Sequence, residues 1–134
     1  MKTLHLSVGV FVVIIFLLTG QYLSFRYPNI GEMDTGLRLL LRSRHIYILL
    51  AGTLNIGLGL YFSYRPRRWR KNMQVIGSGL LILASLLLIA AFFYEPGRTS
   101  LGTPLSHFGL YAIFGGTMLH LISGLKYEKT QVTE

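Results

Sequence analysis

Four long apolar runs separated by short polar segments dominate the chain. They predict helices over residues 3–25, 44–64, 73–94 and 104–125. Each run is long enough to cross the hydrocarbon core of a bilayer as a helix, which takes about 20 apolar residues. Residues 33–43 alternate leucines with arginines and predict an amphipathic lead-in to the second run. The pattern therefore predicts an all-α integral membrane protein that forms one antiparallel four-transmembrane-helix bundle.

Turn-forming residues mark the ends of these runs. Tyr27-Pro28-Asn29 breaks the first helix, and Asp34 is placed to cap the N-terminus of the second. Pro104 suits the first position of the last helix, where its missing N–H is not needed. Because the connections are short, we expect helices that follow one another in the sequence to pack side by side.

Composition supports the membrane assignment and excludes several classes of chemistry. Of 134 residues, 51% are hydrophobic and 13% are charged, and the chain has no cysteine. Four spans with short loops leave no room for a soluble catalytic domain. The lack of cysteine excludes disulfides, thiolate metal sites and a cysteine nucleophile.

The positive charge predicts an orientation. The net charge is +8, and the segment RPRRWRK at residues 65–71 places five basic residues within seven positions. Basic loops remain on the cytoplasmic side, so this segment and both termini are expected in the cytoplasm, most plausibly at a bacterial inner membrane. The same charge makes membrane lipids the expected partners and argues against nucleic acid.

Ionisable residues are sparse within the predicted spans. None of the four contains Asp, Glu or Lys. Proton or cation antiporters usually need a carboxylate at membrane depth, and ion channels need a polar ring, so neither function has a residue to carry it. The four histidines and the arginines at the mouth of the second helix remain as candidates.

One pair of histidines is expected at the outer membrane level. His45 and His107 both lie in the first turns of spans that begin on the outer side. Two imidazoles from different helices can ligate a haem iron from opposite faces. Arg38 and Arg42 share a helix face with His45 and are expected to bind the haem propionates. The predicted metal ligands are therefore His45 and His107, with His120 at a second site.

The inner level holds the other two histidines. His5 begins the first span close to the headgroups, and His120 lies about 7.5 Å above the inner end of the last span, at 1.5 Å per residue. His120, together with His5, is expected to form a second or vestigial haem site. A polar ring at this depth needs a partner, and the candidates are Ser123, Thr117 and a hydroxyl on the first span. His107 and His120 stand about 140° apart around their helix, so they cannot face the same neighbour.

Small and polar residues suggest how the helices approach one another. Gly52 and Gly59 follow His45 at seven-residue intervals, which lets a flat ring or another helix come close to the backbone. Ala112, Gly116 and Gly124 form a similar stripe with His120. Asn55, near the middle of the second span, is expected to form a hydrogen bond across the bundle.

These features favour a small membrane protein that binds b-type haem and transfers electrons near a quinone. We expect a carrier rather than an enzyme. The alternative is a non-catalytic accessory or assembly subunit of a membrane complex, whose outer arginines and histidines bind lipid or a partner protein. A third interpretation places quinone or anionic lipid at the same outer cluster without haem.

Overall fold

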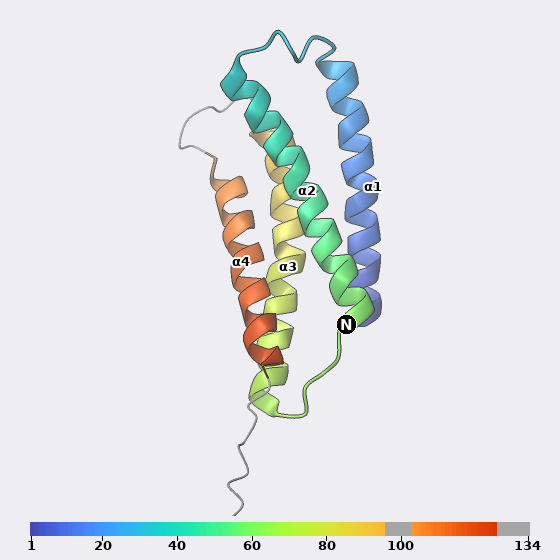
Figure 1. The fold of residues 1–134 in the computed structure, drawn as a ribbon, viewed down its shortest axis with the longest axis vertical. Helices are drawn as coiled ribbons and strands as arrows, with labels where there is room; N and C mark the ends of the chain where they lie inside the picture. Colours follow the sequence, from blue (N-terminus) through green and yellow to red (C-terminus); the bar gives the residue numbers. More distant parts are fainter. Residues whose placement is uncertain (96–102, 126–134) are drawn as a thin grey trace, which may run out of the picture.

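The structure is a computed structural model that describes residues 1–95 and 103–125. It contains four α-helices: α1 (Lys2–Arg26), α2 (Thr35–Tyr61), α3 (Arg68–Tyr94) and α4 (Pro104–Gly124). The loop 27–34 lies at one end of the molecule, and the loop 62–67 lies at the opposite end (Figure 1). The expected turn at Glu95-Pro96-Gly97 and the polar tail after Leu125 fall largely outside the described residues.

The helix ends follow local sequence signals. The Asp34 carboxylate accepts a hydrogen bond from the backbone N–H of Leu37 at 3.1 Å, so the predicted cap of α2 is confirmed. Pro104 is the first residue of α4, also as predicted. The amphipathic lead-in and the second apolar run form one continuous helix. α3 begins at Arg68, inside the basic segment, several residues before the apolar run itself.

Three of the helices are long and apolar enough to cross a membrane: α1, α3 and α4. Within the described residues, α2 does not reach the same apolarity over a full span. Its 27 residues include three arginines, His45 and Asn55, which lower its mean hydropathy. Membrane crossing by α2 therefore needs its polar residues to be paired inside the protein.

Exposure is distributed as in a protein surrounded by lipid. Large apolar side chains face outward, among them Leu17 at 61% exposure and Phe114 at 66%. Polar side chains lie inside, and His5, Asn55 and Ser78 are fully buried. A water-soluble bundle would show the reverse arrangement, so the exposure pattern supports the membrane assignment.

The helices form two closely packed hairpins, α1 with α2 and α3 with α4, joined mainly through α2 and α3. The buried apolar cluster at this junction includes Ile48 of α2 with Leu81, Ala84 and Leu88 of α3. α1 and α4 lie at opposite sides of the molecule (Figure 1), and over the described residues their backbones do not approach each other. The first residues of α1 and the last residues of α4 nevertheless lie at the same end.

Glycines set the close approach within each hairpin. A Cβ added at Gly59 would lie 2.7 Å from the backbone nitrogen of Leu6, and one at Gly9 would lie 2.6 Å from that of Ile56. In the second hairpin, a Cβ at Gly116 would lie 2.8 Å from the carbonyl oxygen of Gly77. The glycine faces of α2 and α4 are thus covered by neighbouring helices. The sequence allowed either a flat ring or another helix against these glycines, and the structure places another helix there.

Gly59→Ala is expected to separate α1 from α2 and to lower the free energy of unfolding by about 1 to 3 kcal/mol, because the new methyl group meets backbone atoms. Gly57 provides a matched control on the same helix, since a Cβ there meets nothing within 4 Å. Gly57→Ala should leave stability unchanged or raise it by up to about 1 kcal/mol. Denaturant titration of both variants in the same detergent measures the difference. Equal stabilities would contradict the close packing of α1 on Gly59.

Candidate functional site

The two outer histidines have separate surroundings. The ring of His45 lies between α1 and α2, stacked on Phe16 with centroids 4.1 Å apart. The hydroxyl of Thr19 donates to the carbonyl of Phe16, so it accepts a hydrogen bond from Nδ1 of His45 at 3.1 Å. His107 is exposed on α4, and its Nδ1 donates to the carbonyl of Thr103 at 2.8 Å. The structure does not bring His45 and His107 together across a common gap.

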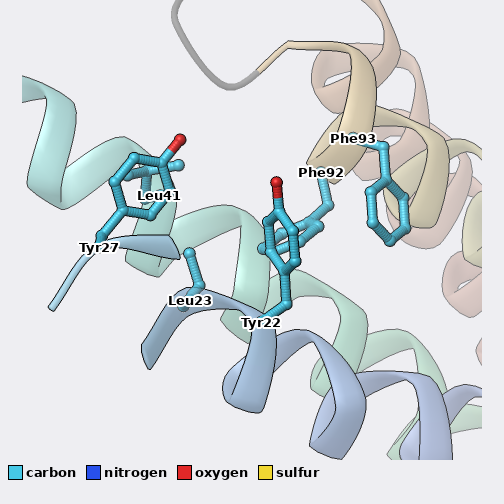
Figure 2. A pocket seen from close by; sticks show the side chains of 6 residues that line it. All are labelled: Tyr22, Leu23, Tyr27, Leu41, Phe92 and Phe93. Carbon is cyan, nitrogen blue, oxygen red and sulfur yellow. The ribbon is translucent and has the colours of Figure 1, made fainter. Parts of the chain in front are cut away.

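A small cavity lies beside His45 at this end of the molecule. It has a volume of about 20 Å³ and is lined by Tyr22, Leu23, Tyr27, Leu41, Phe92 and Phe93 (Figure 2). Phe92 is also a ring neighbour of His45, with centroids 6.3 Å apart. A cavity of this size holds about one water molecule. This cavity has no room for a macrocycle.

The outer arginines differ in their roles. Arg38 donates to the carbonyl of Gly31 at 3.0 Å and thereby stabilises the loop between α1 and α2. Arg42 is exposed. Arg44, which directly precedes His45 on α2, is buried, and its Nε lies 4.0 Å from a carboxylate oxygen of Glu95. The three neighbouring arginines therefore differ in exposure and in the groups that they contact.

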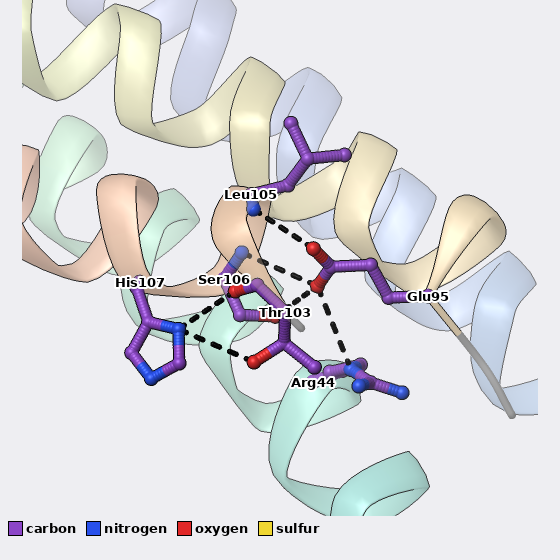
Figure 3. Close-up of polar contacts among 6 residues, drawn as sticks. All are labelled: Arg44, Glu95, Thr103, Leu105, Ser106 and His107. Carbon is purple, nitrogen blue, oxygen red and sulfur yellow. Dashed lines mark hydrogen bonds and ion pairs between the residues drawn. The ribbon is translucent and has the colours of Figure 1, made fainter. Parts of the chain in front are cut away.

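Glu95 links α2 and α3 to the start of α4. Its carboxylate accepts hydrogen bonds from the backbone N–H of Leu105 at 2.8 Å and of Ser106 at 3.3 Å, and from the Ser106 hydroxyl at 2.7 Å (Figure 3). Arg44 approaches the same carboxylate from α2. A carboxylate at a helix N-terminus satisfies free N–H groups and the helix dipole. From the sequence, Glu95 was expected only in a turn, and nothing in the local pattern paired it with Arg44.

The inner end brings two histidines together. His5 of α1 and His120 of α4 have ring centroids 6.4 Å apart and planes inclined at 78°. The two rings meet across the molecule, although α1 and α4 do not pack against each other along their lengths. This is the pair that the sequence placed at the inner membrane level.

A hydrogen-bond chain fixes the orientation of His5. The amide nitrogen of Asn55 donates to the carbonyl of Ala51 at 2.9 Å and to the hydroxyl of Ser85 at 3.1 Å. The amide oxygen of Asn55 therefore accepts from Nδ1 of His5, at 2.7 Å. The predicted hydrogen bond of Asn55 across the bundle is thus present. Because Nδ1 carries the proton, Nε2 of the neutral ring presents a bare lone pair.

Nε2 of His5 is a buried ring nitrogen with no hydrogen-bond partner among the described residues. Burial of an unsatisfied polar atom disfavours the folded state by about 1 to 3 kcal/mol. A histidine that donates one ring N–H to an oriented acceptor and presents its other nitrogen has the arrangement of a metal ligand.

His120 is held by a different helix from the one expected. Its Nε2 lies 3.2 Å from the hydroxyl of Ser78 on α3. Ser123 instead donates to the carbonyl of His120 within α4, at 2.8 Å. The choice between these hydroxyls depends on the packing of α3 against α4, so the sequence of α4 alone did not identify the partner.

Phe62 lies against both rings of the inner pair. Its centroid is 6.1 Å from that of His5 and 5.8 Å from that of His120, so it lies close to the plane midway between them. The side chain of Gln74 fixes the adjoining backbone by binding Ser63 and Arg65. An open pocket of about 380 Å³, lined in part by Phe62 and Lys2, lies next to this position. The buried side chain of Phe62 therefore borders both histidines and the open pocket.

The donor set suits an ion that needs two protein ligands. Within residues 1–95 and 103–125, no group of three or more His, Cys, Asp or Glu side chains is placed to hold a metal ion. His5 and His120 are the two residues that would hold such an ion, and Nε2 of His120 would have to leave its hydrogen bond with Ser78 if that nitrogen were the ligand. Comparison of the chain with protein families, with curated proteins and with solved structures finds no match.

Proposed function

We propose that this chain is a membrane-embedded electron carrier that binds one b-type haem through His5 and His120. The observation that carries the proposal is the buried, unpartnered Nε2 of His5 beside the ring of His120. Iron in a haem takes four ligands from the macrocycle and needs only two from the protein. The two-histidine donor set therefore suffices for haem, although it is too small for a closed structural zinc site.

The proposed topology is an antiparallel bundle that crosses the inner membrane four times, with both termini in the cytoplasm. The basic segment 65–71 then faces the cytoplasm, and α2 crosses with its polar residues directed inward. The pairing of Arg44 with Glu95 and of Asn55 with His5 supports this, because it removes the polar groups of α2 from lipid. Lys2 at the rim of the inner pocket is the cation proposed to face a haem propionate.

Haem content per chain tests the proposal. Protein expressed in cells supplied with haem and purified in mild detergent should contain about one haem per chain, since the inner pair offers one pair of axial ligands. Apoprotein that takes up no haem on titration would contradict it.

Substitutions of Phe62 should change the affinity of the protein for haem. Phe62→Ala should raise haem affinity, and Phe62→Trp should lower it, each by about tenfold, because the side chain occupies the plane between the two rings. Tyr61→Trp, at a neighbouring position that is 86% exposed, is the matched control and should have no effect. Haem titration followed by absorbance measures all three. Equal affinity for the two Phe62 variants would place the haem elsewhere.

The second candidate function is a non-catalytic accessory or assembly subunit. The packing of Phe62 against both histidine rings favours it. If Phe62 stays packed against both rings, the hydrogen bonds of His5 to Asn55 and of His120 to Ser78 serve helix packing alone. The exposed Arg42 and the basic loop would then bind lipid or a partner protein. This candidate predicts colourless protein that co-purifies with another membrane protein in stoichiometric amounts.

A further inference from the structure

An open polar pocket lies at the end of the bundle where α1 begins and α2 ends. It has a volume of about 380 Å³ and is lined by Met1, Lys2, Thr3, Phe62, Ser63 and Tyr64. The lining combines one lysine with three side-chain hydroxyls, and the four residues that carry these groups are exposed. The ammonium group of Lys71 lies over the ring of Tyr64, 5.4 Å from its centroid, and brings a second positive charge beside the pocket. All of these groups can donate hydrogen bonds to an anion.

A buried glutamine holds one wall of this pocket in place. Gln74 of α3 is 5% exposed, and its amide nitrogen donates a hydrogen bond to the carbonyl of Ser63 at 2.9 Å. Its amide oxygen accepts a hydrogen bond from the backbone N–H of Arg65 at 3.1 Å. The two hydrogen bonds fix the backbone on both sides of Tyr64. This wall of the pocket is therefore preorganised, which lowers the entropic cost of binding a ligand there.

The positive charge around the pocket is not balanced by carboxylates in the part of the chain that the structure describes. The basic residues at this end are Lys2, Arg65, Arg67, Arg68, Arg70 and Lys71. The acidic residues of ranges 1–95 and 103–125 are Glu32, Asp34 and Glu95. They lie in the loop 27–34 and at the end of α3, at the opposite end of the bundle (Figure 1). The pocket is therefore complementary to an anionic ligand.

Apolar side chains follow the pocket along the helices. Leu4 comes directly after Thr3 on α1 and is 47% exposed, and Leu60, near the end of α2, is 56% exposed. The pocket thus adjoins the apolar surface of α1, a candidate membrane span. A phospholipid matches both parts, because it joins a phosphate to acyl chains, whereas a soluble anion matches only the charged part. A zwitterionic headgroup would bring its own cation toward Lys2 and Lys71, so a headgroup with a net negative charge is favoured.

We propose that this pocket binds one anionic phospholipid, with the phosphate held by Lys2 and Lys71 and the acyl chains along the apolar surface of α1 and α2. The site differs from the general attraction of a basic loop for anionic membranes, because its preference depends on particular side chains and on a preorganised wall. The proposal does not depend on haem. Lys2 is also the cation proposed to face a haem propionate, so the decisive variants are at Lys71 and Gln74.

Native mass spectrometry of the full chain with equimolar phosphatidylglycerol and phosphatidylcholine tests the proposal. The wild type should retain one phosphatidylglycerol, with a preference of about tenfold over phosphatidylcholine. Lys71→Gln should lose about fivefold of this preference, because it removes one of the two cations that hold the phosphate. Arg67→Gln removes the same charge from the basic segment 65–71 but lies outside the pocket lining. It is the matched control and should lose less than about twofold.

Gln74→Ala separates a preorganised site from diffuse attraction, because it changes no charge. It should also lose about fivefold of the preference, whereas Gln21→Ala, on an exposed position near the other end of α1, should lose none. If circular dichroism shows that Gln74→Ala has lost helix content, the comparison of Lys71→Gln with Arg67→Gln decides alone.

Three results would overturn the site. Equal losses in Lys71→Gln and Arg67→Gln, or a full preference in folded Gln74→Ala, would reduce the binding to diffuse attraction by the basic segment. Displacement of phosphatidylglycerol by inorganic phosphate would identify the pocket as a site for a free anion instead.

Discussion

Replacing His5 by alanine is expected to abolish haem binding, with a loss of affinity of at least about a hundredfold. On the proposed function, the substitution removes one of the two histidines that would hold the haem, and it leaves the oxygen of Asn55 without its donor. His120→Ala should have the same effect, since His120 would be the second of these two histidines. The Soret absorbance of purified protein, normalised to chain concentration, measures the loss.

His45→Ala and His107→Ala are the matched controls for this experiment. Both residues lie at the other end of the helices, with partners of their own in Thr19 and Thr103. They should keep the full haem content. Loss of haem in these variants, with retention in His5→Ala, would move the cofactor to the outer pair that the sequence first suggested. Added imidazole should partly restore the spectrum of His5→Ala, which separates loss of a ligand from loss of folding.

The second large effect is expected at Glu95. Glu95→Ala should lower the free energy of unfolding by about 3 to 5 kcal/mol, because it leaves the buried guanidinium of Arg44 without its carboxylate. It also removes the acceptor for the backbone N–H groups of Leu105 and Ser106 at the start of α4. Denaturant titration followed by circular dichroism measures the change.

An exposed carboxylate on the same side of the bundle gives the control. The exposed carboxylate of Glu32, in the loop between α1 and α2, accepts a hydrogen bond from the amide of Asn29 at 3.4 Å, and Glu32→Ala should change stability by less than about 0.5 kcal/mol. The double variant Arg44→Leu with Glu95→Leu should recover part of the loss, since no charge is then left buried. A small effect of Glu95→Ala, similar to that of Glu32→Ala, would show that the ion pair does not hold α4 in place.

The sequence predicts the helices well because their signals are local. The apolar runs, the cap at Asp34 and the start of α4 at Pro104 depend on neighbouring residues alone. Membrane crossing by α2 is harder to judge, because its arginines and Asn55 lower its apolarity and their partners lie on other helices. The hydropathy of α2 alone does not identify those partners.

The site is predicted only in part, for the same reason. Equal membrane depth places His45 with His107 and His5 with His120, but depth does not say which faces of the helices turn toward each other. The approach of α1 to the glycines of α2 orients His45 toward Phe16 and Thr19, and packing on Asn55 turns His5 fully inward. The sequence indicated a shallow, headgroup-facing His5. Its burial is a consequence of the long-range contact with Asn55.

Electron paramagnetic resonance of the oxidised wild-type protein tests the central claim most directly, because it reports the axial ligands of the iron. Haem held by His5 and His120 should give a low-spin ferric signal typical of two imidazole ligands, at about one iron per chain, which disappears in both His5→Ala and His120→Ala. A high-spin signal, or a low-spin signal that survives both substitutions, would contradict it.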